Sequence, residues 1–380
     1  MFDCPENLFD CPENLTLISE MATIQPANVQ MFQPARVQTG AWLFSRDVDL
    51  LVFLGSPVVA LLLIPLGMRA GVLYGETPDW TWVPAVLLID VAHVYATAFR
   101  VYLDREELAR RKTLYLLVPL IGLAFGILLY SRGEIVFWRA LAYLAVFHFI
   151  RQQYGWLALY RAKAGDRGRL GKLIDSGAIY LATIYPVVYW HTHLPRRFWW
   201  FLPHDFAAVP VALDRVLLPA YLLALASYAA RSIYRGLVLH KPNPGKDIVF
   251  FTTAVCWYVG IVGLNSDYVF TVTNVITHGV PYLALVYWYA RSRRDKIGGI
   301  YKMITGNPLI FLLVLWLGAY IEELLWDRGV WHDRAWLFGA AWDTGWFKLI
   351  LVPLLALPQL VHYVLDGFVW RRKNNPNWSL

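Results

Sequence analysis

Apolar and polar positions alternate along this 380-residue chain in long blocks. Ten mostly apolar runs are separated by short polar connections, and about 20 helical residues cross the ~30 Å hydrocarbon core of a bilayer. The pattern predicts an all-α fold, a polytopic integral membrane helical bundle with about ten transmembrane helices. The predicted spans are residues 48–68, 80–102, 113–131, 134–160, 173–192, 211–235, 248–265, 268–290, 308–326 and 346–370.

Lysine and arginine gather in every second connection between these spans. Because an excess of Lys and Arg marks the cytoplasmic side of a membrane protein, this alternation predicts that both termini are cytoplasmic. We expect a multi-pass protein of a bacterial inner membrane. The basic connections are residues 104–112, 161–172, 235–246 and 291–302, with the tail from Arg371.

Composition agrees with the spacing of the apolar runs. Hydrophobic residues make up 58% of the chain and charged residues 16%, against about 25% charged in a soluble domain. The formal charge of +7 is divided among the connections, and no nucleic-acid-binding module is recognisable, so we expect no nucleic-acid partner. We expect contact with membrane lipids along the whole bundle.

The first thirty residues do not follow the pattern of spans. The heptapeptide FDCPENL at residues 2–8 recurs at residues 9–15, and no sustained apolar run follows before residue 30. We interpret residues 1–30 as a disordered tail or as a misassigned extension, with Met21 or Met31 as the true start. The remaining residues, 31–380, are predicted to form a single transmembrane helical domain.

Four histidines lie inside predicted spans, and all four are on helices that run towards the basic side. Counted to the inner ends of their spans, they lie about 13–20 Å deep at 1.5 Å per helical residue. Ionisable groups at such depth are costly in lipid and usually face a partner or a cavity. The sequence therefore predicts one layer of imidazoles within the bundle, formed by His93, His148, His278 and His362.

Carboxylates accompany two of these histidines at helical spacing. Asp90 lies three residues before His93, and Asp366 lies four residues after His362. A carboxylate one turn away can bind a metal or hold the second imidazole nitrogen, and such sets on facing helices are typical of metal sites in bundles. Ligands of nitrogen and oxygen without thiolate favour non-haem iron, one ion or two. The predicted metal ligands are His93, His148, His278, His362, Asp90 and Asp366.

Other polar residues near the layer suggest supporting roles. Gln152 and Asn274 are predicted to orient a substrate or the ligand imidazoles. Arg100 and Arg151 either bind an anionic head group or a substrate carboxylate entering from the cytoplasm, or neutralise the two aspartates in a structural network. A single buried histidine is often only a packing residue, so the shared depth and the acidic neighbours carry the metal hypothesis.

A second group of histidines lies on the opposite side of the predicted membrane. It consists of His191, His193, His204 and His332. Tryptophans flank these residues, as in an interfacial aromatic belt. Either a belt or an outer metal site is compatible with the sequence.

In ligand type and architecture the chain resembles integral-membrane non-haem iron oxygenases. The HxxxH and HxxHH boxes of the desaturase and hydroxylase superfamily do not occur in the sequence. Closer in style are the bacterial carotenoid-cleaving dioxygenases of the Brp/Blh type, which are polytopic with a few single intramembrane histidines. The resemblance concerns architecture alone. It implies a class of enzyme and transfers no residue.

The expected function is therefore that of a metal-dependent membrane oxidoreductase. Such an enzyme would hydroxylate, desaturate or cleave a lipid or isoprenoid with O₂, with an electron-donor protein where the reaction needs one. Two alternatives stay open. Two histidines could ligate a b-type haem in a quinone-linked electron-transfer protein, or the polar stripes could form the proton relay of a proton-coupled transporter.

Overall fold

The computed structural model describes residues 42–75 and 77–371. Contacts divide the chain into residues 1–38 and residues 39–380, and everything below belongs to the second unit. The prediction about residues 1–30 lies outside the described residues.

The described part of the chain is helical, and the structure is 80% helix with no strand in that part. The α-helices are α1 (Arg46–Asp49), α2 (Ser56–Ala70), α3 (Asp79–Trp82), α4 (Ala92–Arg100), α5 (Arg105–Arg110), α6 (Lys112–Ser131), α7 (Glu134–Lys163), α8 (Arg169–Thr192), α9 (Ala212–Leu237), α10 (Pro244–Trp257), α11 (Asp267–Ile297), α12 (Gly299–Gly306), α13 (Pro308–Trp326), α14 (Ala335–Phe338), α15 (Lys348–Leu355) and α16 (Leu357–Val369). The π-helical stretches are η2 (Leu50–Gly55), η3 (Val83–Val91), η4 (Tyr258–Gly263) and η5 (Asp327–Trp331), and η6 (Gly345–Phe347) is a 3₁₀ turn. The prediction of an all-α bundle is confirmed.

Helix starts follow the expected capping chemistry. Asn243 and Asn307 each precede a proline at the first helical position, and their side-chain oxygens accept backbone N–H groups of α10 and α13. Ser266 caps α11 in the same way by accepting from Val269. Such caps satisfy donors that a helix leaves unpaired. The tight turn predicted near residue 265 therefore separates two spans.

Eight helical segments in the described residues are long and apolar enough to cross a bilayer. Helices α7 and α8 coincide with two further predicted spans and have 30 and 24 residues, but polar side chains lower their hydropathy. α7 carries Arg139, His148, Arg151 and Gln152 within its length. The chain is thus an integral membrane bundle by length and composition, and the count of ten spans stays a prediction.

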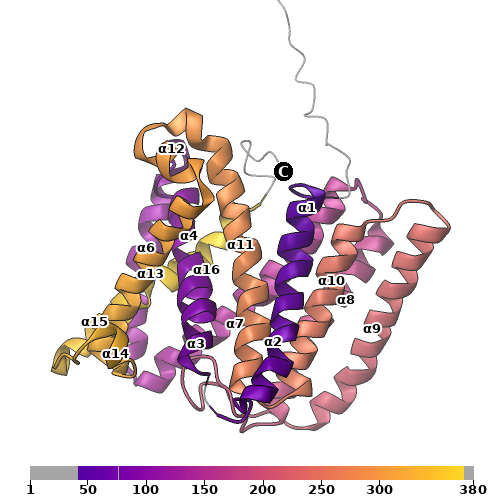
Figure 1. Cartoon of the computed structure of the whole chain (residues 1–380). Helices are drawn as coiled ribbons and strands as arrows, with labels where there is room; N and C mark the ends of the chain where they lie inside the picture. Colours follow the sequence, from indigo (N-terminus) through magenta and orange to yellow (C-terminus); the bar gives the residue numbers. More distant parts are fainter. Residues whose placement is uncertain (1–41, 76, 372–380) are drawn as a thin grey trace, which may run out of the picture. The chain divides into compact units, whose positions relative to one another are not determined.

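Helix α11 occupies the centre of the bundle (Figure 1) and packs against α2, α4, α10, α12 and the π-helical η3. Of its most apolar stretch, 78% is buried in protein, compared with 11% for α9, which lies at the periphery. A helix enclosed by protein can carry polar side chains at membrane depth because they do not face lipid. The surroundings of α11 are therefore where a polar site can form.

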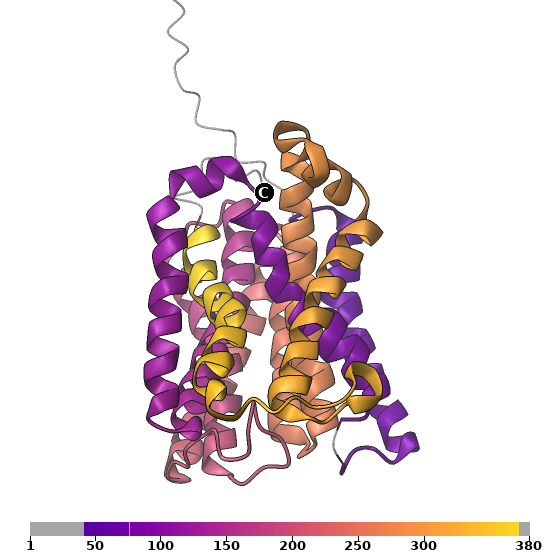
Figure 2. The same cartoon turned by 90° about the vertical axis from the view of Figure 1, so that its left-hand side faces the viewer.

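The basic connections meet at one end of the bundle. Figures 1 and 2 place α1, α5 and α12 at this end, and α3 and α14 at the opposite one. Asp175, at the start of α8, pairs with Arg161 of α7, Arg231 of α9 and Lys246 of α10. Ionic contacts between neighbouring connections thus hold these helix ends together.

A second carboxylate belongs to the same network. Asp166 pairs with Arg231 and Arg235. Burial alone would raise the pKa of Asp166, but the hydrogen bond from Arg231 and the positive charges of Arg161, Arg231 and Arg235 lower it below the usual value. Because the pKa of Asp166 is lower in the folded state than in the unfolded state, ionisation of this carboxyl stabilises the fold. The stabilisation is complete at any pH above the ordinary aspartate pKa of about 3.9. That stabilisation is lost only as the pH falls towards the lowered value.

Asp175→Asn is expected to lower the free energy of unfolding by about 3–5 kcal/mol, because it leaves buried cations without their counter-charge. The Asp175 side chain is fully buried, whereas Asp295 is 68% exposed and pairs with Lys302 at the surface. Asp295→Asn is therefore the matched control and should leave the stability nearly unchanged, because exposed ion pairs contribute little. Unfolding of the two variants in the same detergent would measure the difference, and equal stabilities would contradict this role of Asp175.

Candidate metal centre

Four separate helices each bring one histidine to the centre of the bundle. His93 lies in the first turn of α4 directly after the π-helical η3, His148 lies midway along α7, His278 lies in α11, and His362 lies in α16. π-Helical turns inside α-helices frequently occur at functional sites. The predicted layer of imidazoles is confirmed as a geometric cluster.

The cluster is compact and closed to solvent. Each imidazole offers one potential ligand atom, and these four atoms lie within 4.8 Å of one another. All four side chains are buried, and none is more than 4% exposed. Among the described residues it is the one group of three or more histidine, cysteine or acidic side chains with metal-binding geometry.

Three of the four outer ring nitrogens (Nδ1) lie near polar groups, whereas Nδ1 of His278 is buried without a hydrogen-bond partner. The Nδ1 atom of His93 lies 3.6 Å from an Asp90 oxygen, that of His148 lies 3.9 Å from Asp366, and that of His362 lies 2.8 Å from the Thr97 hydroxyl. A polar group behind Nδ1 fixes the imidazole tautomer and leaves the Nε2 lone pair free to bind. The two aspartates therefore stand where they orient the imidazoles.

The inner ring nitrogens face one another. Nε2 of His93 and Nε2 of His278 are 3.2 Å apart. The Nε2 atoms of His148 and His362 are buried without a hydrogen-bond partner. Buried polar atoms in proteins are nearly always satisfied, so converging lone pairs of this kind fit a cation held between them.

The dimensions suit a single metal ion. Ligand nitrogens about 2.0–2.1 Å from a tetrahedral ion are about 3.4 Å apart, which is compatible with a group enclosed within 4.8 Å. Asp90 and Asp366 approach the imidazoles from the Nδ1 side. Their positions correspond to the second coordination shell of a four-imidazole site.

A close approach between two helices sets the spacing of the cluster. Gly279, next to His278 in α11, faces Ile89 of η3, which lies four residues before His93. A Cβ atom at position 279 would lie 2.5 Å from Ile89 Cγ2 and 3.2 Å from the Ile89 carbonyl oxygen. Glycine therefore allows α11 to bring His278 against His93.

Three aromatic residues of the site were not predicted from the sequence. The Tyr282 hydroxyl donates to Asp366 at 2.7 Å and lies 3.1 Å from the Thr97 hydroxyl. Phe149 stacks on the His278 ring at a centroid distance of 3.5 Å, and the Tyr363 ring lies 4.9 Å from that of His148. Tyr282 stands four residues after His278 on the same helix face, a spacing that could have indicated it.

Gln152 and Asn274 occupy different environments. The Gln152 amide donates to the backbone carbonyl of His278 at 3.2 Å, and its Oε1 atom is buried without a hydrogen-bond partner. The Asn274 amide donates to the carbonyl of Phe270 in its own helix at 3.0 Å. Gln152 thus contacts a residue of the cluster, and the predicted role of Asn274 as an orienting group stays untested.

The two arginines bind groups of the chain itself. Arg100 is buried and forms an ion pair with Glu107 at 3.1 Å, and it donates to the carbonyl of Val369 at 2.9 Å. Arg151 is exposed, hydrogen-bonds Tyr180 and lies over the ring of Tyr154. Binding of a substrate head group by either arginine stays a prediction.

In the second group of histidines, His191 and His193 form hydrogen bonds with other groups of the chain. His191 Nδ1 lies 2.6 Å from the Val187 carbonyl, and its Nε2 lies 3.1 Å from the Tyr143 hydroxyl. His193 Nδ1 lies 2.9 Å from the Tyr189 carbonyl. His204 and His332 adopt left-handed backbone conformations. In the part of the chain that the structure describes, these residues form no cluster with metal-binding geometry.

Asp366→Asn is expected to lower metal affinity about 10–100-fold, the usual effect of removing a carboxylate that orients ligand imidazoles. One Asp366 oxygen lies 3.9 Å from His148 Nδ1 and the other 4.0 Å from His362 Nδ1. Competition with a chromophoric chelator would measure the affinity. The exposed Asp333→Asn is the control, and unchanged affinity in Asp366→Asn would remove this carboxylate from the site.

Comparison with protein-family models, curated proteins and solved structures gives no match for this chain. The architectural resemblance to membrane non-haem iron oxygenases therefore stays an expectation. The buried four-histidine cluster is the observation from which function is inferred.

Proposed function

We propose that this protein is a membrane-embedded metalloenzyme that binds one non-haem iron ion through His93, His148, His278 and His362 and oxidises a lipid or isoprenoid with O₂. The observation that carries the proposal is the convergence of four buried imidazoles within the helical bundle. Buried ring nitrogens without a hydrogen-bond partner, such as Nε2 of His148 and of His362, are expensive in a core of helices. A bound cation would offset that cost.

The ligand chemistry is compatible with iron in a non-haem site. Imidazole nitrogens suit iron, zinc, copper and nickel, whereas hard oxygen-binding ions prefer carboxylates. Neighbouring imidazole rings of the cluster are in contact, with centroid distances of 4.6–5.1 Å. A porphyrin ring between two axial histidines would need a flat gap that these contacts fill, so the arrangement argues against haem.

The surroundings favour oxidation of an apolar substrate. Bound iron would supply activation of O₂. Phe149, Tyr282 and Tyr363 surround the imidazoles with aromatic surface, which excludes water from the site. The Thr97 hydroxyl lies 2.8 Å from Nδ1 of His362, and Asp90 and Asp366 lie 3.6 and 3.9 Å from Nδ1 of His93 and of His148. Groups of the chain itself therefore stand where they would orient the ligands.

The three reactions within this class differ in what they consume. Oxidative cleavage of a carbon–carbon double bond by O₂ places one oxygen atom on each new carbonyl and needs no external reductant. Hydroxylation and desaturation each take up two electrons and two protons with O₂ and release water, so both need an electron-donor protein. Adding or omitting a reductant would therefore separate cleavage from the other two reactions.

The experiment that tests the proposal is metal analysis of detergent-purified protein after anaerobic loading with Fe(II) and removal of excess, with an absorption spectrum. We expect about one iron per chain without a Soret band. O₂ uptake with a carotenoid and with a long-chain fatty acid, each with and without reductant, would then identify the reaction. A chain that retains no metal, or that shows a Soret band, would overturn the proposal.

A further inference from the structure

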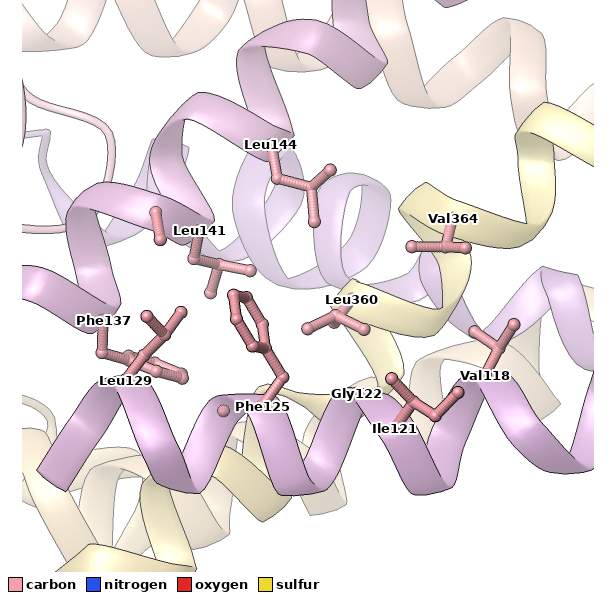
Figure 3. Close-up of a pocket in the computed structure, with 12 residues that line it drawn as sticks. Val118, Ile121, Gly122, Phe125, Leu129, Phe137, Leu141, Leu144, Leu360 and Val364 are labelled. Carbon is pink, nitrogen blue, oxygen red and sulfur yellow. The ribbon is translucent and has the colours of Figure 1, made fainter.

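An apolar cavity lies beside the metal centre, between α6, α7 and α16 (Figure 3). Its volume is about 290 Å³, near the lower bound of about 300 Å³ for ordinary ligand pockets. Every side chain that lines it is a hydrocarbon, and its two glycines, Gly122 and Gly126, lie close to Leu360 and Pro353. The side chains labelled in Figure 3 point from the three helices into a common space.

The cavity is elongated along α6. The α6 lining residues run from Val118 to Leu129 in steps of three and four, which is one continuous helix face. At 1.5 Å per residue this stripe is about 16 Å long. Such a shape matches an extended chain better than a compact ring system.

The cavity faces the hydrocarbon core of the bilayer. Only 17% of the most apolar stretch of α6 is buried in protein. The lining residues Ile121 and Phe125 are 62% and 52% exposed, so the bilayer reaches the edge of the cavity. The molecules that can enter from this side are those dissolved in lipid.

The inner wall of the cavity leads to the imidazole cluster. Leu141 and Leu144 line it and lie seven and four residues before His148, which places all three on one face of α7. Tyr363 packs in the same apolar cluster as Leu141 and Leu360 and also contacts the His148 ring. Leu144 and Tyr363 thus connect the cavity to the ligands.

We infer that this cavity binds the long hydrocarbon chain of the substrate, with its reactive carbon directed past Tyr363 towards the four histidines. The inference rests on the proposed function for its chemistry, but binding of the chain does not depend on the metal. The ligand class is an extended acyl or polyisoprenoid chain that enters from the bilayer. An apolar lining selects by length and shape, because it offers no polar contact to a head group.

Photo-crosslinking with a long-chain fatty acid that carries a mid-chain diazirine tests the inference in the purified full-length protein. Ala140→Phe and Leu144→Phe each place a ring in the cavity. Leu120→Phe is the matched control, because Leu120 lies on the same α6, is 64% exposed and does not line the cavity. Iron content is measured for the parent and the three variants in parallel.

We expect labelled peptides from α6, α7 and α16. Labelling should fall at least 10-fold in Ala140→Phe and in Leu144→Phe, whereas labelling and iron content should be unchanged in Leu120→Phe. An excess of unlabelled carotenoid or fatty acid, but not of phospholipid, should compete with the probe. Labelling that is equal on the peripheral α9, that resists both substitutions, or that phospholipid alone displaces would overturn the inference. If the protein shows the expected labelling but binds no iron, the cavity is a chain-binding site and the proposed enzymatic function is wrong.

Discussion

His278→Ala is expected to abolish iron retention and to lower turnover more than about 100-fold. Removal of a group that merely orients a ligand costs about 10–100-fold in affinity or activity, and a direct ligand costs more. His278 is fully buried, and its Nε2 lies 3.2 Å from that of His93. The substitution therefore removes one of four converging donors and leaves a small void.

His193→Ala is the matched control for this substitution. His193 directly follows α8, and its Nδ1 lies 2.9 Å from the Tyr189 carbonyl oxygen. Iron content by mass spectrometry and O₂ uptake should therefore be unchanged in that variant. Full iron occupancy in a well-folded His278→Ala protein would place the metal elsewhere and refute the four-histidine site.

Gly279→Ala is expected to lower iron affinity at least about 10-fold although every ligand is retained. The added methyl group would lie 2.5 Å from Ile89 Cγ2 and 3.2 Å from the Ile89 carbonyl oxygen. The Cγ2 methyl is fixed to the branched Cβ of Ile89, and the carbonyl oxygen belongs to the helix backbone. Neither can move aside as the end of a flexible side chain can, so α11 must move away from η3. That movement separates His278 from His93, and an overpacked contact of this kind costs about 1–3 kcal/mol.

Gly155→Ala provides the comparison. Gly155 lies in α7, and a Cβ atom there would meet nothing within 4 Å. Because alanine favours a helix interior over glycine by about 0.5–1 kcal/mol, this variant should be as stable as the parent or more so, with unchanged iron binding. Equal iron affinities in the two variants would mean that the approach at Gly279 does not set the spacing of the ligands.

The histidine layer could be predicted from the sequence because membrane burial constrains depth. Each span must cross the same hydrocarbon core, so distance along a helix converts into depth. The four histidines share a depth on their predicted spans, and Asp90 and Asp366 stand one turn from two of them. Depth along a span and helical spacing are properties of single helices, so they can be predicted without knowing how the helices pack.

What could not be predicted depends on which helices are neighbours. Phe149 of α7 stacks on His278 of α11, a contact that follows from packing between segments distant in sequence and from ring orientation. Arg100 pairs with Glu107 across the turn that joins α4 to α5. The π-helical winding of η3, directly before His93, also has no signature in apolar spacing. Secondary structure and depth are local properties, whereas these contacts are properties of the assembled bundle.

The positions of the four histidines along the chain have a consequence for biogenesis. The first ligand candidate is in α4 and the last is in α16, the final helix of the described residues. Helices enter the membrane in order of synthesis, so the four-imidazole cage closes only when the last of these helices has inserted and packed. Since metal binding is coupled to the folding that assembles its ligands, iron loading would mark chains whose insertion is complete, and shortened translation products would leave the ribosome without a cofactor site.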